Sequence, residues 1–321
     1  MTAVSPHGDL LLLGGNGNPE LSEKIAREIN LPLADIKVTR FADGEYDIKI
    51  GESVRGHDVF VIQPTCYPVS ENLIQLFLIL DALRRASSSR VNAVVPYFGY
   101  ARKEKKTQPR DPISAKLMAN IIEMAGAKRM ISVDLHAEAI QGFFDIPVDA
   151  LNSAKILARH VRERHSDDIV VVSPDVGGTE RARRLARLLD APIAIIDKRR
   201  PRDDHVEVVH VIGDVSGKNC VIIDDLISTG GTLASAAQAL RAKGAIGVDV
   251  VATHGVLTDG ALQRLHDAPI DEICITDTIP LRESHGNRGD HQRLRILSVA
   301  PLIAEAIVRV HEGRSVSELF R

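Results

Sequence analysis

Two carboxylates and a cluster of hydroxyls and glycines lie close together in one stretch of the sequence. The apolar segment 221–223 ends at Asp224 and Asp225, and the residues that follow include Ser228, Thr229, Gly230, Gly231 and Thr232. Ionised carboxylates accept hydrogen bonds from neighbouring sugar hydroxyls. Glycines let several backbone N–H groups converge on one anion, and a helix N-terminus favours the same anion. The combination predicts a site for a sugar phosphate.

A strand, a loop and a helix are needed to position these residues. The β-branched run before Asp224 reads as a buried strand, and 233–243 has the pattern of a helix. Ligands bind at the C-terminal edge of an open parallel sheet. A tight strand-to-helix turn would explain the two glycines but not the acids beside them. The stretch resembles the phosphoribosyl-pyrophosphate loop of the type I phosphoribosyltransferase fold, which serves both enzymes that use the activated ribose and enzymes that make it.

Further polar residues come directly after apolar, β-branched segments. They are His136, Asp175 and a basic run that contains Lys198 and Arg200. Asp175 suits a metal ion or a hydroxyl. A lone histidine is usually structural, so both interpretations of His136 stay open. The basic run is either a solvated face or a source of cations for the crevice.

A basic segment, 101–111, follows another predicted strand, 91–96. It is either a solvated mobile loop or a cationic lid over polyphosphate, because point charges neutralise phosphate oxygens. After it, Asp111 and Pro112 are expected to cap a helix that reaches Ala125. The glycine-rich loop 14–17 could hold phosphate, but without lysine or clustered hydroxyls a simple turn is preferred.

The bulk composition restricts the class of protein. The 321 residues are 44% hydrophobic, enough for two α/β domains. A formal net charge of −3 and an aromatic share of 3% argue against a nucleic-acid partner. The three cysteines are widely spaced and resemble reduced core thiols. With no secretory signal pattern and no apolar run long enough for a bilayer, we expect a cytoplasmic protein without a membrane partner.

Strands and helices alternate through two halves of the chain. This predicts an α/β fold with two doubly wound domains of the type I phosphoribosyltransferase kind, and an echo of 221–232 at 131–142 favours a duplication. The expected parts are an N-terminal domain in 1–150, a C-terminal domain with the phosphate loop in 151–300, and a helix in 301–321 that packs back on the first domain. A strand at 295–299 is expected to return with that helix.

Several motifs, in order along nearly the whole chain, resemble those of the ribose-phosphate pyrophosphokinase (phosphoribosyl pyrophosphate synthase) family. They occupy 41–45, 95–102, 112–116, 134–137, 141–144, 172–178 and 224–232. A plain phosphoribosyltransferase would share the last motif and lack most of the others. The resemblance implies transfer of the β,γ-diphosphoryl group of ATP to the C1 hydroxyl of ribose 5-phosphate. The products would be AMP and 5-phosphoribosyl 1-pyrophosphate, for nucleotide biosynthesis.

The resemblance also implies a role for each matching residue. Lys198 and Arg200 would be catalytic, and Arg200, Asp224, Asp225, Ser228, Thr229, Gly230, Gly231 and Thr232 would bind ribose 5-phosphate. ATP would be bound by Phe41, Asp43, Gly44, Glu45, Arg102, Lys103 and His136, with Mg²⁺ at His136 and Asp175. The adenine would be shared with a neighbouring subunit, so the family implies a homo-oligomer, a hexamer built from dimers.

Some residues depart from the family pattern, and these departures affect the expected regulation and the expected choice of diphosphoryl donor. Ser53, Arg55, Arg110, Ser315 and Ser317 match a regulatory site for inorganic phosphate and ADP, but Ala150 replaces a frequent asparagine and Pro109 lacks an N–H. The lid has Lys103-Glu104 where the family usually has Gln-Asp, which leaves the donor preference open. The main rival to an enzyme is a non-catalytic homologue that binds the product or a nucleotide. A phosphoribosyltransferase with an added domain is the second.

Overall fold

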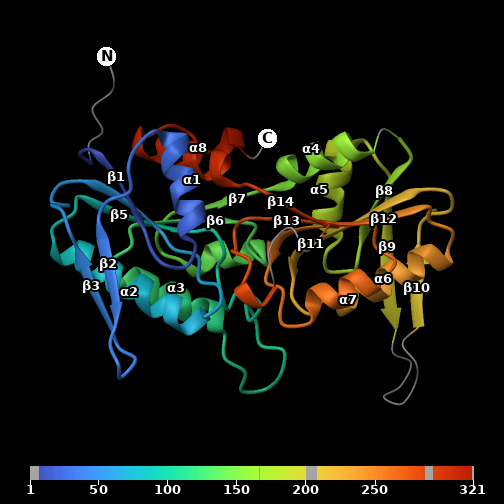
Figure 1. The fold of residues 1–321 in the computed structure, drawn as a ribbon, viewed down its shortest axis with the longest axis horizontal. Coiled ribbons are helices and arrows are strands. Elements are labelled where there is room, and N and C mark those ends of the chain that lie inside the picture. The colour runs from blue at the N-terminus through green and yellow to red at the C-terminus, as the bar shows by residue number, and fades with distance from the viewer. Residues whose placement is uncertain (1–6, 166, 200–207, 286–291, 320–321) are drawn as a thin grey trace. The chain divides into compact units, whose positions relative to one another are not determined.

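The computed structural model describes residues 7–165, 167–199, 208–285 and 292–319, which fold into two compact units (Figure 1). Unit 1 comprises Met1–Asn152, Thr278–Pro280 and Ser298–Arg321, and unit 2 comprises Ser153–Asp277 and Leu281–Leu297. The chain therefore passes between the units more than once. Among the described helices, none combines the length and apolar character needed to cross a membrane.

Unit 1 contains a five-stranded parallel sheet in the order β1-β4-β5-β6-β7 and a separate antiparallel hairpin. Its elements are β1 Leu10–Gly14, α1 Pro19–Ile29, β2 Ile36–Arg40, β3 Tyr46–Ile50, β4 Asp58–Ile62, α2 Val69–Arg85, β5 Arg90–Val95, α3 Ser114–Ala125, β6 Arg129–Val133, η1 Glu138–Phe143, β7 Val148–Leu151, α8 Ala300–His311 and η4 Ser317–Leu319. Leu12 of β1 pairs with β4 on one side and forms a parallel bridge to Leu33 on the other. The direction in which successive segments are added to the sheet therefore reverses at β1.

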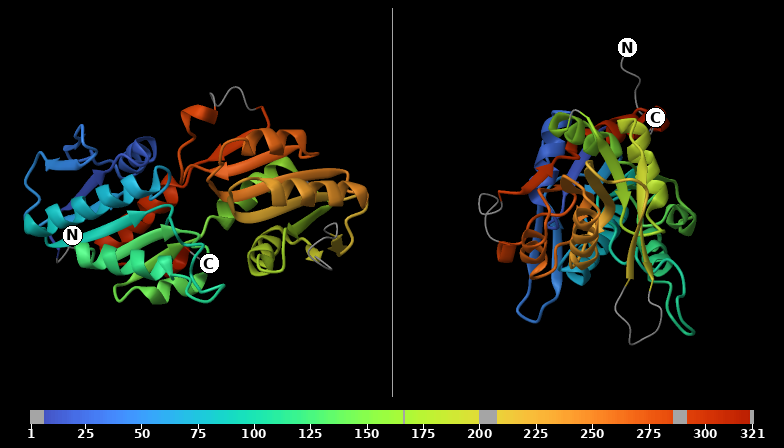
Figure 2. Two further views of the ribbon diagram at one scale, coloured as in Figure 1. Left: turned by 90° about the horizontal axis from the view of Figure 1, so that it is seen from below. Right: turned by 90° about the vertical axis from the view of Figure 1, so that its right-hand side faces the viewer.

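Unit 2 contains a seven-stranded sheet in the order β10-β9-β8-β11-β12-β13-β14, antiparallel only between β9 and β10. Figure 2 shows the ribbon from two further sides. Its elements are α4 Ala154–Arg164, β8 Ile169–Ser173, α5 Thr179–Leu189, β9 Ile193–Arg199, β10 Val208–Ile212, β11 Asn219–Ile227, α6 Gly231–Ala242, β12 Gly247–Gly255, α7 Ala261–Asp267, β13 Glu272–Thr276, η2 Glu283–His285 and β14 Leu294–Leu297. The order reverses between β8 and β11, which confirms the doubly wound prediction and marks the place where such sheets bind ligands.

The central strand β11 is buried on both faces. Ile222 packs in one core cluster with Leu233 and Leu240 of α6, whereas Val221 and Ile223 belong to a second cluster. A parallel strand covered on both sides reads as a continuous apolar run, because neither face is free for polar residues. This is why the sequence before Asp224 is uninterrupted, and why the carboxylates begin only after the pairing of β11 with β8 has ended at Ile222.

The two units repeat one order of elements. A strand and helix (β1-α1 or β8-α5) precede a hairpin. Three further strands, a 3₁₀ helix and a fourth strand follow it. The helix after each repeat is α4 or α8. However, α4 packs on α5 in unit 2 and α8 packs on α1 in unit 1 (Figure 1). Each repeat therefore supplies its last helix to the other unit. The topology supports the predicted duplication, but the echo between 131–142 and 221–232 is wrong, because β11 matches β4 in this order and the strand at 131–133, β6, matches β13.

The expected return of the strand at 295–299 to the first domain is wrong. Strand β14 pairs in parallel with β13 in unit 2, with Ile273 opposite Leu294 and Ile275 opposite Ile296. Leu294 and Ile296 pack against the core of unit 2, which retains the strand there. Only the chain from Ser298 onward, which includes α8, belongs to unit 1.

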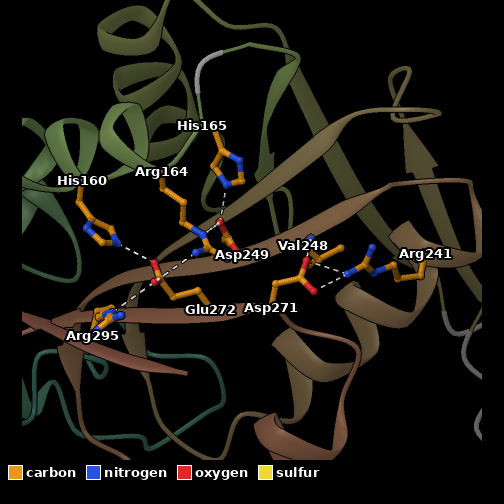
Figure 3. A network of polar contacts seen from close by, with 9 residues as sticks. All are labelled: His160, Arg164, His165, Arg241, Val248, Asp249, Asp271, Glu272 and Arg295. Carbon is orange, nitrogen blue, oxygen red and sulfur yellow. Dashed lines mark hydrogen bonds and ion pairs between the residues drawn. The ribbon is translucent and has the colours of Figure 1, made fainter. Parts of the chain in front are cut away.

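Buried carboxylates hold α4 at the N-terminal ends of the strands (Figure 3). Asp249 accepts hydrogen bonds from Nε of Arg164 at 2.7 Å and from the imidazole of His165. Glu272, the first residue of β13, lies 2.6 Å from Nε2 of His160. In unit 1, Asp58 similarly meets Nδ1 of His311 at 2.9 Å. These groups lie at the sheet edge opposite the carboxyl ends of the strands, so we assign them to structure.

Candidate functional site

The two carboxylates at the end of β11 are bridged by an arginine. Nη1 of Arg181 lies 3.1 Å from Oδ1 of Asp224, and Nη2 lies 3.3 Å from Oδ1 of Asp225. Oδ1 of Asp224 also accepts the Asp225 N–H at 2.9 Å. The Asp225 side chain is only 5% exposed. One guanidinium therefore bridges two adjacent acids at the winding reversal of unit 2 and balances only one of their two negative charges.

Burial raises the pKa of Asp224 to about 7, and the neighbouring charge of Asp225 adds to the rise, while Arg181 opposes it. Desolvation and a like charge both disfavour the ionised acid. The folded chain therefore binds a proton here more tightly than the unfolded chain does. A ligand that donates hydrogen bonds or positive charge to this pair would displace that proton.

The sequence motifs did not single out Arg181. A signal was present, however. Arg181 lies in the first turn of α5, two residues after Thr179. A cation there opposes the positive end of the helix dipole, so it calls for a specific acidic partner.

The glycine and hydroxyl loop is braced from behind by the segment before α7. The Leu257 N–H donates to the Ile227 carbonyl at 2.8 Å, the Thr258 N–H donates to the Ser228 carbonyl at 3.0 Å, and the Arg264 guanidinium donates to the Thr229 carbonyl. These contacts fix the conformation in which α6 begins. The loop therefore has a defined shape next to the carboxylate pair.

The two glycines of this loop have different tasks. Gly230 has φ +76°, and a Cβ atom on it would lie 2.9 Å from Cγ of Leu265. Gly231 has ordinary φ, and within the described part of the chain a Cβ atom would meet nothing nearer than Oγ1 of Thr229 at 3.8 Å, chain neighbours aside. Gly230 is required by the turn, whereas Gly231 leaves open space at the helix N-terminus. That space suits an anion.

Asp175 lies in the turn after β8, the strand next to β11. Its Oδ1 accepts the Gly178 N–H at 2.8 Å, and its carbonyl accepts the Ser173 hydroxyl at 2.6 Å. The residue is exposed. Both strands that flank the reversal therefore end in carboxylates.

The two basic residues predicted to be catalytic are only partly described. Lys198 belongs to β9, three residues beyond Ile195, which pairs with Ser173 at the end of β8. Its backbone therefore extends about 10 Å past that strand at the usual rise of a β-strand. Arg200 lies outside the described residues.

In unit 1, four expected ATP residues share the tight turn between β2 and β3. The Phe41 N–H donates to the Glu45 carbonyl at 2.8 Å, the Gly44 N–H donates to the Phe41 carbonyl at 3.0 Å, and Asp43 Oδ1 accepts the Glu45 N–H at 3.1 Å. The Phe41 side chain is half exposed. The turn presents an aromatic ring and two acids to solvent.

The lid follows β5, and His136 follows β6, its neighbour in the parallel sheet. Arg102, Lys103 and His136 therefore come from the same edge of unit 1. The expected helix cap at Asp111 is wrong, because α3 begins at Ser114 after Ile113. The Asp111 carboxylate instead accepts hydrogen bonds from lid groups, among them the N–H groups of Thr107 and Gln108.

The expected regulatory residues are all in unit 1. Ser53 and Arg55 are exposed before β4, and Arg110 is exposed in the lid with φ 70°. The C-terminal turn is held on α8, where Arg309 donates to the Ser315 carbonyl at 2.8 Å and the Ser317 N–H donates to Oγ of Ser315 at 3.2 Å. Their regulatory role stays a prediction.

The carboxylates near this site fit a magnesium ion that takes a few ligands from the protein and the rest from water and substrate. Within the described ranges, no group of three or more His, Cys, Asp or Glu side chains could hold a metal. Mg²⁺ is commonly held by one or two carboxylates together with substrate phosphates. Asp175, Asp224 and Asp225 supply such oxygens, whereas the nitrogen ligand of His136 suits Mg²⁺ less well.

The chain is similar to known proteins over nearly its whole length. Family models described as the N-terminal domain of ribose phosphate pyrophosphokinase and as the phosphoribosyl synthetase-associated domain match residues 10–126 and 203–321. Ribose-phosphate pyrophosphokinases of Caldanaerobacter subterraneus and Listeria ivanovii are 53% and 52% identical to it, covering 97% and 95% of this chain and 98% and 95% of their own lengths.

A crystal structure of phosphoribosylpyrophosphate synthetase from Mycobacterium smegmatis superposes with a TM-score of 0.89 at 41% identity, covering 95% of this chain and 99% of that one. A match of this extent includes parts of both units. The chain belongs to the ribose-phosphate pyrophosphokinase family.

Proposed function

We propose that this protein transfers the β,γ-diphosphoryl group of ATP to the C1 hydroxyl of ribose 5-phosphate, giving 5-phosphoribosyl 1-pyrophosphate and AMP for nucleotide biosynthesis. The observation that carries the proposal is the carboxylate pair Asp224 and Asp225 beside the loop 228–232 at the winding reversal of unit 2. Relatives named ribose-phosphate pyrophosphokinase support it and leave a non-catalytic role without support.

Ribose 5-phosphate is proposed to lie across this edge. The 5-phosphate would occupy the open space over Gly231, where Ser228, Thr229 and Thr232 add hydroxyl donors to the backbone N–H groups. The sugar hydroxyls would donate to Asp224 and Asp225, in place of part of the Arg181 contact. Fixing both ends of the sugar orients the C1 hydroxyl for in-line attack on the β-phosphorus.

The donor needs charge neutralisation more than covalent chemistry, because phosphoryl transfer depends mainly on positioning and electrostatics. Lys198 and Arg200 are proposed to stabilise the charge that develops on the moving diphosphoryl group. Arg102 and Lys103 would hold the donor phosphates. The adenine would bind at the Phe41, Asp43, Gly44 and Glu45 turn of a neighbouring subunit.

Mg²⁺ is the proposed cofactor. When bound, it would offset phosphate charge and align the donor with the sugar. Asp175 would hold it with Asp224 and Asp225 nearby, and His136 would contact it through water or contact the nucleotide phosphates instead.

A homo-oligomer, a hexamer built from dimers, is proposed as the working form. Support comes from an exposed apolar set on the neighbouring helices α2 and α3, namely Ile74, Leu78, Leu117 and Met124. Exposed apolar patches are typical of interaction surfaces, and we propose that these four side chains form one. Inorganic phosphate and ADP are the proposed regulators. The three buried free cysteines are consistent with the reducing cytoplasm.

The deciding experiment is AMP formation by purified protein from ATP, Mg²⁺ and ribose 5-phosphate, with and without inorganic phosphate. We expect AMP only when the sugar is present. AMP formed without sugar, or no AMP with either ATP or other diphosphoryl donors, would refute the proposed reaction. A phosphate dependence would report on the regulatory residues separately.

A further inference from the structure

One carboxylate collects four donors inside the lid. Oδ2 of Asp111 accepts the N–H groups of Thr107 at 3.2 Å and Gln108 at 3.1 Å, the Thr107 hydroxyl at 2.8 Å and the Lys103 ammonium at 3.2 Å. Backbone N–H groups, a hydroxyl and an ammonium are the donors that typically surround a bound phosphate. Hydrogen bonds from Thr107 and then Lys103 lower the pKa of Asp111 to about 2, so the carboxylate is ionised at neutral pH.

The backbone around this cluster is fixed on both sides. The Lys103 N–H donates to the Tyr100 carbonyl at 3.2 Å, and the Lys103 carbonyl accepts the Ala115 N–H of α3 at 3.3 Å. Tyr100 and Arg110, near the two ends of the lid, have φ values of 64° and 70°. Residues other than glycine seldom adopt this left-handed conformation. The lid is therefore closed on itself, with unfavourable backbone at both ends that a rearrangement would relieve.

We propose that Asp111 competes with the phosphates of the diphosphoryl donor for Lys103, and so acts as a specificity-determining residue. The proposal rests on the proposed function, since it takes Lys103 as a donor-binding residue. To bind Lys103, a ligand must displace the Asp111 carboxylate, which two backbone N–H groups also hold in place. A nucleoside triphosphate does so better than a diphosphate, because it carries more negative charge. Because the triphosphate gains more from Lys103 than the diphosphate does, the contact costs the triphosphate more affinity and narrows the difference between the true donor and the shorter nucleotide.

The size of the effect follows from exposure. The Lys103 and Asp111 side chains are 47% and 23% exposed, so water screens their attraction. Exposed ion pairs contribute little free energy. We therefore expect competition worth a factor of roughly two to five in donor affinity, which is a tuning effect rather than a block.

The test is calorimetric titration of the whole protein with the α,β-methylene analogue of ATP, whose transferable bond is stable, and with ADP. We expect Asp111→Asn to bind the triphosphate analogue two- to fivefold more tightly, to tighten less for ADP, and so to discriminate more strongly against ADP. In a Lys103→Gln background the same change should have no effect. The matched control is Glu104→Gln, which removes an equal charge paired with Lys105 at 3.2 Å and should leave affinity unchanged.

Unchanged or weaker binding by Asp111→Asn, or equal tightening by Glu104→Gln, would overturn the proposal. If the wild type binds no analogue, the proposed function fails on its own account. In that case, limited trypsin digestion at Lys103, Lys105 and Lys106 tests whether Asp111 holds the lid together. Asp111→Asn should be cut severalfold faster because the lid loses its internal support, and equal cutting rates would overturn the proposal.

Discussion

Replacing Arg181 with methionine would leave two adjacent acids without their shared cation. Each contact, at 3.1 and 3.3 Å, has a gross attraction of about 5 kcal/mol at an effective dielectric constant near 20. Desolvation of the guanidinium offsets most of it, and removing one partner of a fully buried pair costs about 3–5 kcal/mol. Because Arg181 and Asp224 are 24% and 22% exposed, we expect a loss of about 2–3 kcal/mol at pH 8.

The loss should depend on pH in a defined direction. The raised pKa of Asp224 means that the folded chain binds more protons than the unfolded chain between about pH 4 and 7, so stability falls as pH rises through that window. In Arg181→Met the pKa rises further, and stability keeps falling above pH 7. At pH 5.5 Asp224 is already protonated, so the substitution should cost only about 1 kcal/mol.

The assay is urea unfolding at pH 5.5 and pH 8, followed by far-UV circular dichroism because the chain has no tryptophan. The matched control is Arg183→Met on the same helix, an exposed residue 3.8 Å from Glu180, whose loss should change stability by less than about 0.5 kcal/mol. If Arg181→Met costs the same at both pH values, or no more than Arg183→Met does, the electrostatic account of this pair is wrong.

Four other predictions concern single substitutions. Lys198→Ala should lower kcat by orders of magnitude while ribose 5-phosphate binding, measured by calorimetry, is largely kept, because the charge acts mainly in the transition state. Asp224→Ala should raise KM for the sugar in steady-state assays; an unchanged KM would remove the hydroxyl contact. Gly230→Ala should lower urea stability by about 1–3 kcal/mol because of its positive φ, whereas Gly231→Ala should keep stability and lose sugar affinity. Asp249→Asn should cost about 3 kcal/mol in the same unfolding assay, because Arg164 loses a buried charged partner.

Local sequence patterns were enough to place the main functional stretch. The run before Asp224 could only be a strand covered on both faces, and the loop with Gly230 needed a sharp turn before a helix. Patterns of this kind depend on neighbours along the chain, so they can be read without a fold. The Arg181 contact could not be predicted, because it joins residues 43 positions apart whose meeting depends on how α5 lies on the sheet.

Two errors show the same limit. The pattern at 295–299 correctly indicated a strand but not its sheet, since an alternating apolar segment fits either core. Asp111 before a proline is typical of a helix start, but lid donors engage its carboxylate and α3 begins later. In both cases the local pattern was typical of the predicted feature, but contacts with other residues of the chain decided the outcome.

Within the described residues the duplicated fold does not repeat this site in unit 1, and a side chain explains why. Gln63 is the fifth residue after the start of β4, as Asp224 is after the start of β11. It is wholly buried, its Oε1 accepts the Gly17 N–H at 2.9 Å, and its Nε2 donates to Asn72 at 3.2 Å. The glutamine fills the place that a sugar would need. This supports the preference for a simple turn at the loop 14–17.

The exchange of α4 and α8 sets the order in which a growing chain can be completed. Every element of unit 2 has been synthesised once Leu297 is joined, whereas unit 1 still lacks α8, which begins at Ala300. Until then α1 lacks α8, a helix it packs against, and Asp58 lacks its contact with His311. Unit 1, whose synthesis begins first, is therefore completed last. In a nascent chain the apolar surface that α8 covers stays exposed until α8 has been synthesised.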